Sequence, residues 1–206
     1  GEIRRLKLFD DTRITFCPDS VVGTHSKPVV FVCDNVGIQT MDLAQGWNWV
    51  SFNLRSAQAK GVKNLFIDNS VFSNGDIIKG SLGDARFAEY VAKYNSWSRG
   101  GDDMEIAIGN VYQIYVNKPT TVKFEGYEIA DADRKVAFSK GAWSQLPYLL
   151  KVPQPVNIAM SDYHIGDKAK PGTIIKSHDE FAVADASGVW YGSLQYMRPG
   201  EGYFVN

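Results

Sequence analysis

Acidic residues that could bind a metal ion stand in three close pairs: Asp10 with Asp11, Asp102 with Asp103, and Asp131 with Asp133. Carboxylate oxygens are the ligands that calcium prefers, but a calcium loop also needs an alternating order of oxygen ligands that ends in a Glu. None of the pairs has that order. Solvated turns are the competing interpretation of such pairs, and we therefore expect no metal site in them.

Other catalytic and cofactor signatures do not occur in the sequence. The histidines His25, His164 and His178 are scattered, without the paired spacing of a zinc-binding helix. There is no GxSxG, P-loop or GxGxxG motif, and the segment RPGEGY leads into a terminal strand rather than a phosphate-binding helix. Hydrolysis needs placed carboxylates or an activated nucleophile, and no pair is singled out by its context. We expect a protein without a cofactor that is not an enzyme.

Aromatic side chains make up 13% of the chain and are the best candidates for ligand contacts. Tryptophan and tyrosine rings that lie exposed on a sheet can stack on sugars or on partner proteins, whereas buried rings support a core. The tryptophans recur at matched places in the sequence, which favours the core. We therefore expect five structural aromatic anchors: Trp47, Trp49, Trp97, Trp143 and Trp190.

The segment VWYGSLQYM supplies the candidate surface contact. Side chains alternate between the two faces of a strand, so Trp190, Gly192, Leu194 and Tyr196 should share one face. The opposite face, which starts with Tyr191, carries more polar side chains. Tyr191 is therefore our candidate ligand-binding residue.

The cysteines Cys17 and Cys33 each close a strand-like run, RITFC and VVFVC. Their spacing excludes a CxxC metal or redox motif. Two interpretations stay open: two buried free thiols, or one disulfide between neighbouring strands, which would suit an exported protein.

Composition narrows the classes of partner. The 206 residues carry a net charge of −1, which argues against nucleic acid and against a basic membrane-binding surface. No apolar run approaches the roughly 18 residues of a membrane span, so we expect no membrane insertion. The chain has 19 glycines and 8 prolines and begins with Gly1. The glycines and prolines favour strands and turns. A start at Gly1, without a Met, leads us to expect a segment of a longer protein.

A tandem repeat organises most of the chain. The triplet Ile-Ile-Lys starts at Ile77 and at Ile174, and strands ending in Val-Asn close at Asn117 and Asn206. Lys-Pro pairs and glycines before a Trp motif recur in the same order. Landmarks that keep their order while their spacing varies are typical of tandem units with loop insertions. We divide the chain into residues 1–26, a hairpin or the remnant of a preceding unit, and two units of about 90 residues, 27–117 and 118–206.

Each unit is predicted to consist of strands. GWNWVSFNL is apolar on both faces, so we expect it to be buried on two sides. Residues 84–95 have helical spacing after Asp84, but the matching segment of the second unit alternates like a strand, and we favour a strand for Phe87–Val91. Segments 56–69 and 154–163 are candidate helices. The expected fold is mainly β: two tandem β-sandwich or barrel-like repeats, each with at most one short helix.

These motifs resemble a domain that is repeated in large secreted and surface proteins of Bacteroidetes. That domain carries a Gly-Trp-Asn-Trp strand, an Ile-Ile-Lys segment, a Phe-Ala strand, a Trp-Gly-Ser-Leu hairpin and a Pro-Gly-Glu-Gly-Tyr strand. The resemblance covers roughly residues 27–206. The second unit keeps the second half of the pattern but departs at GAWSQLPY, where only Trp143 remains of the Trp pair.

The resemblance implies an extracellular or cell-surface protein and a non-catalytic structural or adhesive β-module. Its partners would be other domains of the same polypeptide or surface proteins. The alternative is a carbohydrate-binding module that uses exposed aromatic residues to hold glycans. The resemblance supplies no catalytic residue.

Overall fold

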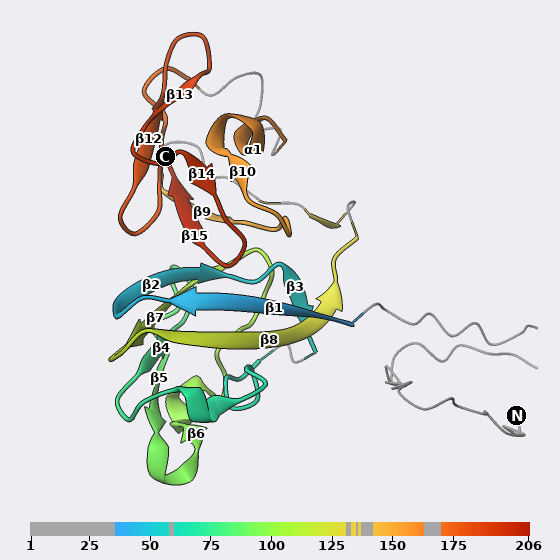
Figure 1. The fold of residues 1–206 in the computed structure, drawn as a ribbon, viewed down its shortest axis with the longest axis vertical. Coiled ribbons are helices and arrows are strands. Elements are labelled where there is room, and N and C mark those ends of the chain that lie inside the picture. The colour runs from blue at the N-terminus through green and yellow to red at the C-terminus, as the bar shows by residue number, and fades with distance from the viewer. Residues whose placement is uncertain (1–35, 58–59, 131–132, 135, 137–141, 163–169) are drawn as a thin grey trace, which may run out of the picture. The chain divides into compact units, whose positions relative to one another are not determined.

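The computed structural model describes residues 36–57, 60–130, 133–134, 136, 142–162 and 170–206 (Figure 1). The chain divides into two compact units, Gly1–Asn35 and Val36–Asn206, and the described residues all belong to the second. The predictions for residues 1–26 and for Cys17, Cys33, His25 and His164 lie outside the described residues. Over the described ranges, no helix is long and apolar enough to cross a membrane.

The fold is mainly β, as the sequence predicts. The N-terminal part of the second unit contains β1 (Val36–Leu43), β2 (Gly46–Ser51), β3 (Leu54–Ser56), β4 (Ile77–Lys79), β5 (Phe87–Val91), β6 (Ser96–Trp97), β7 (Val111–Val116) and β8 (Thr120–Glu128). The C-terminal part contains β9 (Ser144–Pro147), β10 (Gln154–Pro155), α1 (Val156–Asp162), β11 (Ile174–Lys176), β12 (Phe181–Ala184), β13 (Trp190–Gly192), β14 (Tyr196–Met197) and β15 (Gly202–Val205). Short 3-10 turns lie at Asn69–Val71, Ala92–Tyr94 and Arg99–Gly101.

Two five-stranded antiparallel sheets have the same order of sequence motifs. The first sheet runs β2-β7-β4-β5-β6, and the second runs β9-β15-β11-β12-β13. In both sheets the order across the sheet is the same. The strand at or next to the first Trp motif comes first, followed by the closing strand, the Ile-Ile-Lys strand, the Phe-Ala strand and finally a strand that contains a Trp. The shared order is what a duplicated unit would give, but the duplication itself stays a prediction.

The register also matches, with one correction to the alignment by sequence. Trp97 lies opposite Tyr90, and Trp190 lies opposite Ala184. Tyr90 and Ala184 occupy the same position in β5 and β12, counted from the phenylalanine that begins each strand. At the closing strands, however, Ile78 pairs with Ile114 and Ile175 pairs with Val205. Val205 is therefore the counterpart of Ile114, whereas the shared Val-Asn ending equates it with a residue two positions later. Pairing with the Ile-Ile-Lys strand fixes the register, and the terminal dipeptide does not.

Each sheet covers its own hydrophobic core. Alternation along the strands turns one face inward, and the largest fully buried side chains of the first core are Phe52, Ile78, Met104, Tyr112, Ile114 and Phe124. The second core contains Leu146, Tyr148, Ile175, Trp190, Leu194 and Tyr203. Strands with apolar side chains on the inner face and polar side chains on the outer face are the usual result of period-two patterning.

A third sheet crosses the division between the two predicted units. Its order is β1-β8-β3, and β8 pairs with β1 over the full length of β1, from Val36 opposite Tyr127 to Leu43 opposite Thr120. By sequence β8 opens the second unit. In the structure, its residues Val122 and Phe124 are buried in the first core.

The two ambiguous helical segments have different outcomes. Phe87–Val91 is strand β5, as the repeat predicts and against the local helical spacing. The candidate helix at 154–163 contains α1, whereas the candidate at 56–69 is wrong: over its described residues it forms turns and isolated bridges. Phe66 is buried and forms a bridge with Phe124 of β8, so tertiary packing overrides the helical pattern there.

A buried polar network joins the two parts of the second unit. Ser51 is fully buried; its N–H donates to the carbonyl of Gly200 at 3.0 Å, and its hydroxyl donates to the carbonyl of Glu201 at 2.6 Å. The same hydroxyl accepts from the N–H of Tyr148 at 3.0 Å. Asn53 extends the network with a hydrogen bond from its side-chain amide to the carbonyl of Leu150 at 3.1 Å. Buried polar groups that are satisfied across a contact fix its geometry.

Candidate functional site

A row of four side chains crosses the outer face of the first sheet. Trp49 on β2 lies opposite Gln113 on β7, which lies opposite Lys79 on β4, which lies opposite Phe87 on β5. Directly paired residues have their side chains on the same face. The neighbours Val50, Ile78 and Ala88 point into the first core, so this row must point away from it.

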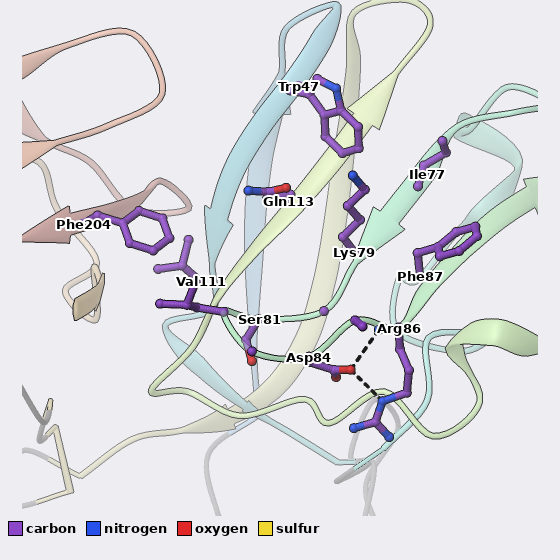
Figure 2. Close-up of a pocket in the computed structure, with 14 residues that line it drawn as sticks. Trp47, Ile77, Lys79, Ser81, Asp84, Arg86, Phe87, Val111, Gln113 and Phe204 are labelled. Carbon is purple, nitrogen blue, oxygen red and sulfur yellow. Dashed lines mark hydrogen bonds and ion pairs between the residues drawn. The ribbon is translucent and has the colours of Figure 1, made fainter. Parts of the chain in front are cut away.

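A cleft of about 560 Å³ opens over Gln113, Lys79 and Phe87 of this row (Figure 2). Its walls come from β2, β4 and β7, from the loop 80–86 and, on one side, from Val111 and Phe204. Figure 2 shows Gln113 in the middle of the cleft, with Trp47 and Lys79 on one side and Arg86 and Asp84 on another. The cleft thus combines apolar rings with a few polar groups, which is typical of small-molecule sites.

Lys79 lies against the ring of Trp47. Its Nζ is 4.4 Å from the ring centroid, within the range of a cation–π contact. Trp47 is half-buried and also makes an edge contact with Tyr115, with ring centroids 5.4 Å apart. Among the described residues no carboxylate pairs with Lys79, whose side chain is exposed. The ammonium group is therefore held in place by the ring but remains available to an anion.

Two further polar groups face the cleft. The side chains of Gln113 and Ser81 line it, and neither makes a side-chain hydrogen bond with another described residue. Gln113 is half-buried in the centre of a sheet whose backbone groups are paired. A ligand that bonds to such a partly buried amide supplies a hydrogen-bond partner without displacing one from the protein.

The acidic group at the rim is already engaged. Asp84 accepts hydrogen bonds at Oδ1 from the Arg86 backbone N–H at 3.0 Å and from its Nε at 2.7 Å. The hydrogen bond between the two side chains lowers the pKa of the Asp84 carboxyl and raises the pKa of the Arg86 guanidinium. A carboxylate held ionised by an arginine is poorly suited to act as a general acid. The arrangement in the cleft favours binding over proton transfer.

The second sheet repeats the row with two positions exchanged. Gln145 lies opposite Phe204, which lies opposite Lys176, which lies opposite Phe181. Both rows thus contain one glutamine, one lysine, one phenylalanine on the Phe-Ala strand and one further aromatic ring. The Nζ of Lys176 lies 4.3 Å from the ring centroid of Trp143, which matches the contact of Lys79 with Trp47.

The second row is more occupied than the first. The ring of Trp49 packs edge-on against Phe204 at 4.8 Å, and Lys176 Nζ is 5.6 Å from Trp49. The amide oxygen of Gln145 accepts a hydrogen bond from the N–H of Val111 at 2.6 Å. Because residues from the N-terminal part fill this row, the first sheet carries the more open site.

Another cavity of about 590 Å³ lies beside Trp49, between residues 40–50 and residues 177–179 and 198–202. Its charged groups already have partners: Arg198 is 3.6 Å from both Glu180 and Glu201. His178 contacts Asp179 at 2.6 Å and packs edge-on against Trp49. This cavity therefore offers fewer available polar groups than the cleft.

The five tryptophans divide into three environments. Trp97 and Trp190 are buried, with 2% and 6% of their surface exposed. Trp47 and Trp49 are only half-buried, and Trp143 is 37% exposed. The prediction that GWNWVSFNL is fully buried on two sides is therefore wrong for one face. The face of Val50 is buried, whereas Trp47 lines the cleft and Trp49 packs against Phe204.

Tyr191 is 61% exposed beside the buried Trp190, as the alternation predicts. The expectation that Tyr196 shares the face of Trp190 is wrong, because Tyr196 is 48% exposed. Strand β13 ends at Gly192, and pairing resumes in a different sheet at β14, so the alternation does not continue between them. Tyr191 does not line the cleft.

One member of each of two predicted acidic pairs forms an ordinary ion pair, whereas Asp10, Asp11 and Asp131 lie outside the described residues. Asp102 contacts Lys63 Nζ at 3.0 Å, and Asp133 contacts Arg55 at 3.3 Å. Within the described part of the chain, no group of three or more His, Cys, Asp or Glu could hold a metal ion. His178 is the histidine that the structure describes, and among the described residues it pairs with one carboxylate, that of Asp179.

No family model, curated protein or solved structure matches this chain. The candidate site therefore rests on the geometry of the chain itself, and the resemblance to the surface domain stays a proposal.

Sequence reasoning did not identify Lys79, Gln113 and Phe87 as site residues. A signal was present for two of them, since the lysine of Ile-Ile-Lys and the phenylalanine of Phe-Ala recur in both predicted units. An apolar strand that ends in the same lysine twice, and a phenylalanine that is exposed twice, at 54% for Phe87 and 53% for Phe181, suggest a shared role on the outer face.

Proposed function

We propose that this chain is a non-catalytic β-module with a structural or adhesive role in an exported surface protein. The observation that carries the proposal is the Ser51 network, in which one buried residue bonds to three backbone groups of the C-terminal part. A module built of two sheets that are joined in this way can transmit position and load as one body. Tandem duplication of one unit, supported by the matched strand order, would be the origin of the two sheets.

Calorimetry tests the structural part of this proposal. We expect the two sheets to unfold in a single transition whose calorimetric and van't Hoff enthalpies agree. Two well-separated transitions would mean that the sheets behave as independent beads, and the proposal of one rigid module would fail.

Export can be tested through the cysteines, although they lie outside the described residues. In an exported protein, Cys17 and Cys33 are free to form a disulfide. Intact mass after alkylation, with and without reductant, counts the free thiols in protein isolated from its natural source. Two alkylated thiols in the unreduced sample would remove this support for export.

A second candidate function is carbohydrate binding, because the cleft presents Trp47 and Phe87 beside the free amide of Gln113. Ring stacking combined with hydrogen bonds from an amide is a chemistry that suits the apolar faces and hydroxyls of sugars. A glycan array probed with the full chain tests it. Specific binding that is lost in Trp47→Ala would support the adhesive role through this cleft, and binding that survives Trp47→Ala would place any sugar site elsewhere.

A further inference from the structure

We infer that the cleft on the first sheet is selective for acidic sugars, with the carboxylate of the ligand on Lys79. This inference rests on the proposed carbohydrate-binding role and names the class of glycan. It concerns a single cleft whose floor is the row Gln113, Lys79 and Phe87, with Trp47 as one wall.

The charge of the cleft favours an anion. Its charged lining residues are Lys79, Asp84 and Arg86. Because Asp84 and Arg86 form an ion pair at 2.7 Å, they largely neutralise each other. Lys79 is left as a positive charge without a carboxylate partner in the described part of the chain, and an ammonium–carboxylate hydrogen bond is stronger than one between neutral groups.

The position of Lys79 is already restricted before a ligand binds. Its contact with the face of Trp47 holds the ammonium group over the cleft. Ordering a lysine side chain costs rotamer entropy. A lysine that is held against a ring has lost part of that freedom in the unliganded protein, so less remains to be lost on binding.

The remaining contacts fit a sugar better than a peptide. The floor of the cleft lies over β7 and β4, which are each paired on both sides, and the neighbouring edge strand β2 is bridged from Val50 to Glu201. An extended peptide on the floor therefore meets no free strand edge. A pyranose ring instead offers an apolar face to the exposed ring of Phe87 and hydroxyls to Gln113 and Ser81. The combination of the Phe87 ring with one amide, one hydroxyl and one ammonium group is matched by a uronic or sialic acid residue.

The test uses an array of matched glycan pairs with the full chain. Each pair contains the same oligosaccharide with its carboxylate free or methyl-esterified, drawn from oligouronates and from sialylated glycans. We expect the free acid to bind at least tenfold more tightly than its ester in one or more pairs. We expect Lys79→Met to remove this preference, because methionine keeps the length of the side chain without its charge.

Lys93→Met is the matched control. Lys93 also lies over an aromatic ring, with Nζ 5.3 Å from the centroid of Tyr94, but it does not line the cleft. It should keep both the affinity and the preference for the acid. A melting temperature close to that of the parent will show that each variant is folded.

Three outcomes would overturn the inference, and they separate it from the proposed function. If acid and ester bind equally and Trp47→Ala abolishes both, the cleft binds carbohydrate without selecting acids. If the acid preference survives Lys79→Met but is lost in Lys176→Met, the site is on the second sheet. If no member of any pair binds, carbohydrate binding and acid selectivity both fail.

Discussion

Tyr112 and Tyr203 make the same hydrogen bond in the two sheets. Each hydroxyl accepts from the backbone N–H of the residue five positions earlier, which is Ala107 for Tyr112 and Arg198 for Tyr203, at 2.8 Å in both cases. Both rings are fully buried, and their strands have matching places in the sheet order. Each tyrosine therefore ties the loop before its strand to a core.

Removing either hydroxyl should destabilise the fold. Tyr112→Phe leaves the Ala107 N–H and the Glu105 carbonyl without the hydroxyl that they bond at 2.8 Å. An unsatisfied buried group costs about 1–3 kcal/mol. Urea denaturation of Tyr112→Phe and Tyr203→Phe should show a loss of that size in each. An unchanged midpoint for both would mean that water replaces the hydroxyl at no cost.

Stability should fall at alkaline pH because of these tyrosines. Burial raises the pKa of Tyr203, and the Glu201 carboxylate raises it further; burial also raises the pKa of Tyr112. Unfolded tyrosine ionises near pH 10, so above that pH the unfolded state binds fewer protons than the native state. The stabilisation is complete below pH 10 and then declines by about 1.4 kcal/mol per pH unit for each tyrosine. Urea midpoints measured from pH 8 to 11.5 should fall less steeply in Tyr203→Phe than in the parent.

Neighbouring positions on β13 should respond very differently to truncation. Trp190 is buried and Tyr191 is exposed. Trp190→Ala is expected to cost about 3–5 kcal/mol of unfolding free energy, and Tyr191→Ala about 0.5 kcal/mol. Because Tyr191 lies outside the cleft, Tyr191→Ala should also keep any glycan binding that Trp47→Ala removes. Loss of binding in Tyr191→Ala would move the ligand site to the second sheet.

The Ser51 hydroxyl should contribute to the coupling between the two sheets. Ser51→Ala removes one donor to the Glu201 carbonyl and one acceptor for the Tyr148 N–H. We expect a loss of about 1–3 kcal/mol and a broader calorimetric transition. Ser187→Ala, in an exposed turn where the hydroxyl bonds to Asp185, is the control and should change little. Equal effects of the two variants would argue against the role of the network.

The mainly β fold could be predicted because period-two patterning and turn residues are local signals. The repeat added information that local patterns lacked, since Phe87–Val91 reads as a helix by its own spacing and is a strand in the structure. The segment around Phe66 could not be assigned in this way, because a partner about 60 residues away, Phe124, determines its conformation.

The candidate site could be predicted only in part. Alternation placed Tyr191 outside and Trp190 inside, but it gave no indication that β13 stops before Tyr196. The cleft depends on the register that brings Lys79 beside Gln113. Register follows from strand pairing over a whole sheet, and a single strand's sequence does not contain it.

The pairing of β8 with β1 determines where this chain can be cut into fragments. A cut between residues 117 and 118 separates β1 from its partner strand and removes Phe124, whose ring packs 4.5 Å from Phe52. The fragment that ends at residue 117 would expose apolar surface and be prone to aggregate. Mixed together, the two fragments should reassociate, with β8 acting as a donated strand that completes the sheet of the first fragment. A cut after Ile129 would leave this strand in place.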